Sequence, residues 1–246
     1  MEVHHHSHHG KKKWTEYLWE FLMLFLAVFC GFLAEYQLEH KIEKDREKQY
    51  IKSLLADLEN DQQILSQHIQ HLQLGIFRID TLINMLNAPS SLADNTGQLY
   101  YLARVAPRLD PLATNSRTFD QLKNSGSFRL IHNIGTSNRI MSYYEKFPLI
   151  RLLESMNATE FNEYKKVAAK IFDPAIFLKM SGKTGGIQRS NENPPLRTSD
   201  RDLLQELSVF SVYLRGNKTG ILQNDEALKA NGLELIEFLK NEYHLK

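Results

Sequence analysis

The strongest pattern in the chain is a continuous apolar run near its N-terminus. Phe21–Ala34 contains fourteen consecutive residues without a polar side chain. At about 1.5 Å per residue this run is shorter than the roughly 30 Å hydrocarbon core of a bilayer, but extension to Tyr17 gives enough length. Aromatic residues of the kind found at membrane interfaces flank the run: Trp14, Tyr17, Trp19 and Tyr36. We therefore predict a transmembrane helix over residues 14–36, with the lipid bilayer as its partner.

A cleaved signal peptide is the alternative to a permanent anchor. Lys11–Lys13 resembles the basic region of such a peptide, and the apolar run has a suitable length. The small residues that cleavage requires are missing, because Phe32 precedes Ala34 by two and Phe29 precedes Gly31 by two. We expect an uncleaved anchor.

The basic residues around the span give two readings of its orientation. Lys11–Lys13 directly precede the span and favour a cytoplasmic N-terminal tail over residues 1–13. More basic residues follow the span, between Lys41 and Lys52, which favours the reverse, but they are interleaved with acidic residues and lie farther from it. We expect a single-pass protein of the inner membrane with a periplasmic C-terminal domain.

Two features of this end carry candidate chemistry. A histidine cluster precedes the span, and clustered imidazoles chelate Zn²⁺, Ni²⁺ or Cu²⁺: His4, His5, His6, His8 and His9. An expression tag would look similar, although Ser7 interrupts the run. Glu20 is either a functional intramembrane carboxylate or a residue that reaches the headgroups. The single cysteine, Cys30, excludes an intrachain disulfide and is expected to be a buried thiol.

A heptad pattern follows the span, over residues 37–88. No proline interrupts the chain from Trp14 to Ala88, so one long amphipathic stalk helix is expected. With Leu55 at position a, ten of eleven a and d sites from Ile51 to Leu86 are apolar, and Gln62 is the exception. The pattern fits a parallel homodimer, in which Gln62 sets the register, or equally a helix packed within its own chain.

The remaining residues, 89–246, favour the second of these readings because they carry apolar helical stripes that need a partner. Short helices are expected at Gly97–Ala106 and Thr118–Asn124, and a helical face covers Arg139–Phe172, where Pro148 starts or bends a helix. A long loop is predicted at 173–199. Ser199 and Asp202 form a capping box for the next helix, and a last helix follows Gly216–Gly220. The fold class is all-α: a transmembrane helix that continues into an extramembrane helical bundle.

Motifs for catalysis or nucleotide binding are not found. Gly182-Lys183-Thr184 lacks the upstream glycine of a phosphate-binding loop, because Phe177 occupies that position. His68 and His71 share a helix but fall outside the a/d positions, so both are expected in solvent, as are His40, His132 and His244. With 30 Lys+Arg against 29 Asp+Glu, no nucleic-acid partner is expected. Asn157 and Asn217 begin glycosylation sequons.

Several segments resemble a family of single-span proteins from Bacteroidota that is defined by a domain of unknown function. The resemblance covers both ends and the middle of the chain: Met1–His6 and the lysines after it, Glu20–Phe29, Gly31–Glu35, Glu47–Leu58, Leu122–Ile131 with Tyr143 and Tyr144, and Leu235–His244. It implies a native histidine cluster and a Gram-negative envelope. It implies no activity and no functional residue.

The function expected from these patterns is non-enzymatic: a membrane-anchored scaffold, sensor or assembly protein. Its partners would be the bilayer and either a second copy of the chain or another membrane protein. Divalent-metal handling by His4–His9 and an ion-coupled membrane complex that uses Glu20 are the alternatives. No cofactor is expected beyond a metal at the histidines.

Overall fold

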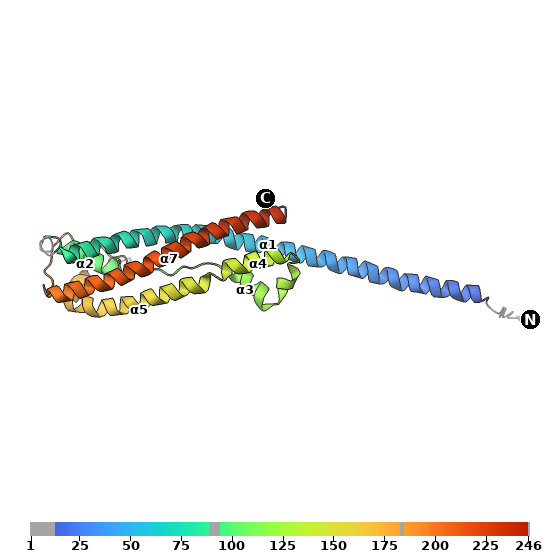
Figure 1. The fold of residues 1–246 in the computed structure, drawn as a ribbon, viewed down its shortest axis with the longest axis horizontal. Coiled ribbons are helices and arrows are strands. Elements are labelled where there is room, and N and C mark those ends of the chain that lie inside the picture. Colours follow the sequence, from blue (N-terminus) through green and yellow to red (C-terminus); the bar gives the residue numbers. More distant parts are fainter. Residues whose placement is uncertain (1–12, 89–93, 183–184, 246) are drawn as a thin grey trace, which may run out of the picture. The chain divides into compact units, whose positions relative to one another are not determined.

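A computed structural model describes residues 13–88, 94–182 and 185–245. In that part of the chain every regular element is a helix, and an isolated antiparallel bridge pairs Ser181 with Ile187 (Figure 1). The elements are α1 (Trp14–Asn87), α2 (Thr96–Val105), α3 (Arg117–Asn124), the 3₁₀ helix η2 (Ser127–Leu130), α4 (Ile134–Tyr144), α5 (Phe147–Ile171), α6 (Pro174–Lys179) and α7 (Arg201–Glu242). The predicted all-α fold is confirmed. The chain divides into two compact units, residues 1–50 and 51–246.

Apart from Lys13, the described residues of the first unit form the N-terminal part of α1. Every residue from Trp14 to Ile42 is exposed, and an 18-residue window there has a mean hydropathy of 2.0 with none of it buried. By length and composition, α1 is the one helix among the described residues that could cross a membrane. Cys30 is exposed on this helix, so the prediction of a buried thiol is wrong. No described residue buries the apolar run.

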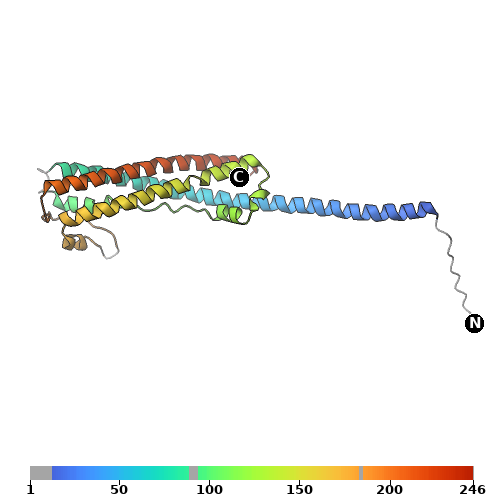
Figure 2. The ribbon, with the colours of Figure 1, turned by 60° about the horizontal axis from the view of Figure 1, so that its bottom comes forward.

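The second unit is built around α1 from Ile51 onward, α5 and α7, which lie side by side in both views (Figures 1 and 2). α7 runs antiparallel to α1, as side-chain contacts along both helices show: Asn87–Ser208 at 3.0 Å, Asp80–Arg215 at 2.5 Å, His68–Asp225 at 2.6 Å and Glu59–Lys240 at 2.8 Å. The apolar core draws on α1, α2, α5 and α7 and includes Leu82, Tyr100, Tyr164, Phe172 and Leu207. From Ile51 onward, α1 is thus packed against helices of its own chain.

The buried face of α1 differs from the predicted a/d stripe. The d residues are buried, but among the a residues only Leu55 is buried, and Gln62, Ile69, Ile76 and Ile83 are half-buried. The second buried series is one position earlier, at g, and we call it the α1 column: Leu54, Asp61, His68, Gly75 and Leu82. The rotation follows from packing against several helices, because a bundle covers a wider face than the narrow contact of a two-stranded coiled coil.

A matching series lies on α7, again at seven-residue spacing and buried throughout. We call it the α7 column: Leu204, Ser211, Lys218, Asp225, Gly232 and Leu239. α7 is also continuous through Gly216 and Gly220, so the predicted break between two helices is wrong. Its start differs as well, because the carboxylate of Asp200, not the hydroxyl of Ser199, caps the first turn by accepting from the Asp202 N–H at 2.9 Å.

The region predicted as a loop, 173–199, contains the short helix α6 and otherwise has irregular structure. It is held against α2. The hydroxyl of Tyr100 donates to the Pro195 carbonyl and accepts from the Asp173 N–H, both at 3.0 Å. The N–H of Gly97 donates to Asn193, and a Cβ on Gly97 would lie 2.2 Å from the Glu192 carbonyl oxygen. This loop is therefore fastened to the second unit near both of its ends.

Candidate functional site

An extended segment without helical structure connects α2 to α3 and runs along the bundle (Figure 1). We call residues 108–116 the strap. At its ends the Arg108 N–H donates to the Val105 carbonyl of α2 and the Ser116 carbonyl accepts from the Asp120 N–H of α3. The backbone groups between them have no sheet or helix to pair with, and polar groups that leave water without a partner cost free energy. The two columns and α5 supply those partners.

Two aspartates of α1 hold the C-terminal part of the strap. The carboxylate of Asp57 accepts from the Asn115 side chain at 2.5 Å and from the N–H and hydroxyl of Thr118 at 3.1 and 2.6 Å. Asp61 accepts from the Asn115 N–H at 2.7 Å. Thr118 lies in the first turn of α3, and the side chain of Ser116, at the N-cap, makes no capping bond there. Asp57 therefore caps α3 from another helix and places a negative charge at its N-terminus.

The middle of the strap is held by a buried ionic network. His68 lies between the Asp225 carboxylate, 2.6 Å from Nδ1, and the Asp110 carbonyl oxygen, 2.7 Å from Nε2. A carbonyl can only accept, so Nε2 carries a proton, and a second proton on Nδ1 gives an imidazolium paired with Asp225. Burial acts to lower the pKa of His68, but the hydrogen bonds to Asp225 and Asp110 outweigh it and the pKa is raised.

Lys218 completes this network about two turns before Asp225 along α7. Its ammonium group donates to the Arg108 carbonyl, and the side chain is only 2% exposed. Burial lowers its pKa to about 8. Gly75 faces it, since a Cβ there would lie 3.3 Å from the Lys218 Nζ, so the glycine leaves room for the lysine. From α5, Glu154 accepts the Leu112 N–H at 2.7 Å. The network thus fastens the strap at several points along its length.

A second cluster of buried polar side chains lies between α1 and α4. Five buried atoms there have no hydrogen-bond partner among the described residues: Asp61 Oδ2, both amide atoms of Gln62, and the hydroxyl oxygens of Tyr143 and Tyr144. Gly232 of α7 lies against them, because a Cβ would be 2.2 Å from Gln62 Nε2. Burial, opposed by the hydrogen bond from Asn115, raises the pKa of Asp61 to about 6, and burial next to Asp61 raises the pKa of Tyr143.

The replacement Asp61→Asn tests the cost of this buried carboxylate. The pKa rises from 3.8 in the unfolded chain, so between about pH 4 and 6 the folded protein binds more protons and its stability falls as the pH rises. Asparagine keeps the acceptor for Asn115 and removes the charge. We expect the free energy of unfolding at pH 7.5 to increase by about 1–3 kcal/mol, with little difference at pH 4.

The measurement is urea denaturation of the full chain in a mild detergent, monitored by circular dichroism. The exposed Glu59 is the control position, and Glu59→Gln should leave the free energy of unfolding nearly unchanged at both pH 7.5 and pH 4. A loss of stability in Asp61→Asn at pH 7.5 would contradict the expectation.

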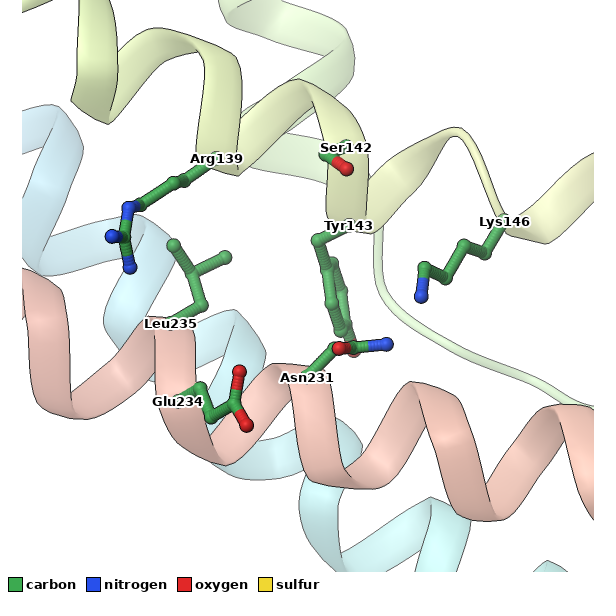
Figure 3. Close-up of a pocket in the computed structure, with 7 residues that line it drawn as sticks. All are labelled: Arg139, Ser142, Tyr143, Lys146, Asn231, Glu234 and Leu235. Atoms are coloured by element: carbon green, nitrogen blue, oxygen red, sulfur yellow. The ribbon is translucent and has the colours of Figure 1, made fainter.

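Tyr143 also lines a small pocket between α4 and α7, with a volume of about 140 Å³ (Figure 3). Arg139, Ser142 and Lys146 lie on the α4 side of it, and Asn231, Glu234 and Leu235 on α7. The guanidinium of Arg139 lies 4.2 Å from the ring centroid of Phe238. The pocket joins basic, acidic and amide side chains at one place, but it is smaller than the roughly 300 Å³ at which sites for small molecules begin.

Two larger cavities flank α5, with volumes of about 400 and 490 Å³. Both include Arg108, Phe161 and Lys165 in their walls. Their size is that of a small-molecule site.

Several residues that the sequence singled out are not assembled into a site. The metal prediction, His4, His5, His6, His8 and His9, lies outside the described residues. Within the part of the chain that the structure describes, no group of three or more His, Cys, Asp or Glu side chains could hold a metal ion. Glu20 lies on the exposed part of α1. His71 is exposed, as predicted, as are His40, His132 and His244.

His68 is the clearest correction, because it is 6% exposed and not in solvent. Its g position is part of the buried face of α1. The sequon residue Asn157 is also buried, at 3% exposure, which removes it from the surface where glycosylation occurs. Sequence reasoning missed Asp57, Lys218 and Asp225 altogether. The signal that could have found two of them is the α7 column, since its polar residues repeat every seven positions.

Comparisons with protein-family models, with curated proteins and with solved structures found no match to this chain.

Proposed function

We propose that the protein is a single-pass, non-enzymatic scaffold or sensor of the bacterial cell envelope, anchored by residues 14–36. The observation that carries the proposal is the exposed apolar part of α1. Eighteen residues with a mean hydropathy of 2.0 are not buried by any described residue, and exposed apolar surface of this extent is typical of a lipid or protein interface.

The continuity of α1 supports the sensor or scaffold role. The helix that contains the apolar run is unbroken to Asn87, and its later residues form the α1 column, to which the strap is fastened. A helix that begins in lipid and continues into a packed core links that core covalently to the membrane. Lys11–Lys13 before the span support a cytoplasmic N-terminus and a periplasmic second unit in the inner membrane.

Reporter fusions after Lys246 test both the anchor and its orientation. We expect the fused alkaline phosphatase, which folds only in the periplasm, to be active, and a fused green fluorescent protein, which fluoresces only in the cytoplasm, to be dark. We also expect the protein to resist extraction from membranes by alkaline carbonate. Release by carbonate would exclude the anchor. A fluorescent green fluorescent protein fusion together with an inactive phosphatase fusion would indicate the opposite orientation, with the second unit in the cytoplasm.

A further inference from the structure

The cavity of about 400 Å³ has an aromatic wall and lies between α2, α5 and the segment that begins with α6. Phe161, Tyr164 and Phe172 come from α5 and the residue after it, and Phe177 from α6. Phe172 and Phe177 stack with ring centroids 5.4 Å apart. Ala168 and Ala169 leave space in front of these rings. The wall can therefore hold a compact apolar body.

Four cationic side chains line the same cavity: Arg104, Arg108, Lys165 and Arg197. Arg104 is held in place because its guanidinium donates to the Phe177 carbonyl and to the Ser181 hydroxyl. Arg197 is held by a 2.7 Å bond to the Ala169 carbonyl. No aspartate or glutamate is among the described residues that line this cavity. An anion at this place would meet several donors and no repelling carboxylate.

Arg108 and Lys165 have no ion pair with a described residue. Lys165 lies over the ring of Phe161, 4.8 Å from its centroid, whereas the next residue, Lys166, forms a 2.7 Å ion pair with Glu163 away from the cavity. Burial and the nearby charge of Arg108 lower the pKa of the Arg104 guanidinium. No ion pair with a described residue therefore neutralises Arg108 or Lys165, and a bound anion would relieve the repulsion between the positive charges that line the first cavity.

The adjoining cavity of about 490 Å³ supplies a polar end. Its wall includes Asn157, which is 3% exposed and whose Oδ1 has no hydrogen-bond partner among the described residues. The acidic residues Asp110 and Glu154 also line this second cavity, and Glu154 is already bonded to the strap. Because Asp110 and Glu154 would repel an anion in the second cavity, an anionic group is favoured in the first cavity. Asn157 is then available to bind a neutral polar group.

We propose that the first cavity binds a small organic carboxylate with an apolar body, its carboxylate between Arg108 and Lys165 and its apolar part on the aromatic wall. This proposal adds a ligand class to the proposed sensor, and the biological role of the ligand rests on that proposed function. Binding itself is measurable whichever way the protein is oriented, so the failure of one proposal is distinguishable from the failure of the other.

Isothermal titration of octanoate into the full chain in nanodiscs of zwitterionic lipid tests the proposal, with empty nanodiscs as the blank. We expect saturable binding at one site. Acetate has the charge without the apolar body and octylammonium has the body with the opposite charge, so both should bind at least about tenfold more weakly. Octylammonium binding as tight as octanoate, or no saturable octanoate binding, would overturn the proposal.

The variant Arg108→Gln/Lys165→Gln removes the two unpaired charges. Both residues are exposed, so the fold should survive, and octanoate affinity should fall by at least about tenfold. The matched control Lys166→Gln/Lys170→Gln removes two exposed charges from α5 outside the cavity and should change affinity by less than about twofold. Ala169→Trp fills the cavity and should abolish binding. Equal affinity in the double variant and the wild type would overturn the site.

Discussion

Replacement of Asp225 by alanine is expected to lower the free energy of unfolding by about 3–5 kcal/mol. Asp225 has no exposed surface, and its carboxylate lies 2.6 Å from Nδ1 of His68. Removing it leaves a buried imidazole with only the Asp110 carbonyl as partner, and it loosens one of the points at which the strap is fastened. Urea denaturation of the full chain in a mild detergent, followed by circular dichroism, measures the change.

The neighbouring residue provides the control. Glu226 is exposed on α7, and Glu226→Ala should change stability by no more than about 0.5 kcal/mol. The pH dependence distinguishes an ionic contact from simple packing. Because the pKa of His68 is raised in the folded protein, the pair contributes fully below the ordinary pKa of histidine and less as the pH rises through the raised value. The difference in the free energy of unfolding between wild type and Asp225→Ala should therefore become smaller at alkaline pH. A gap independent of pH would contradict the charged pair.

Two arginines within the apolar run are expected to prevent membrane integration. Each arginine near the centre of a transmembrane helix costs about 2.5–3.5 kcal/mol on insertion, so Leu24→Arg/Ala27→Arg costs about 5–7 kcal/mol. Both positions are exposed on α1, and no described residue buries them. We expect the variant to move from the carbonate-resistant membrane fraction to the soluble or aggregated fraction.

The control variant carries two arginines at the same spacing, but on the second unit. Gln67 and Gln70 are exposed on α1 three residues apart, and Gln67→Arg/Gln70→Arg should leave the protein in the membrane. If the Leu24→Arg/Ala27→Arg variant also stayed integrated, the apolar run would not be the anchor.

Local patterns predicted much of the helical structure. α2 and α3 occur where apolar spacing predicted them, and Pro148 lies in the first turn of α5. Proline suits that position because the first N–H groups of a helix have no intrahelical partner. Gly216 and Gly220 misled the prediction, because a glycine in a helix costs only about 1 kcal/mol and the long contact of α7 with α1 outweighs it.

The polar network was beyond reach from periodicity alone. A histidine at g and a lysine in α7 look like solvated residues when each helix is considered by itself. They become core residues only because the antiparallel pairing puts His68 opposite Asp225 and Gly75 opposite Lys218. The two columns carry a joint signal, with apolar residues at their ends and complementary polar or small residues at their centres. Recognising it requires knowledge of which helices pair and in which direction.

The sequence by itself determined the apolar run, the all-α class and the positions of most helices, because hydropathy and helix formation depend on neighbouring residues in the chain. Only the tertiary structure decided which face of α1 is buried, where the strap lies, and that Arg108, Lys165 and Phe177 line one cavity. Those features depend on contacts between residues far apart in the chain. A buried charge is stable only where packing brings it a partner, so its role is set by the fold as a whole.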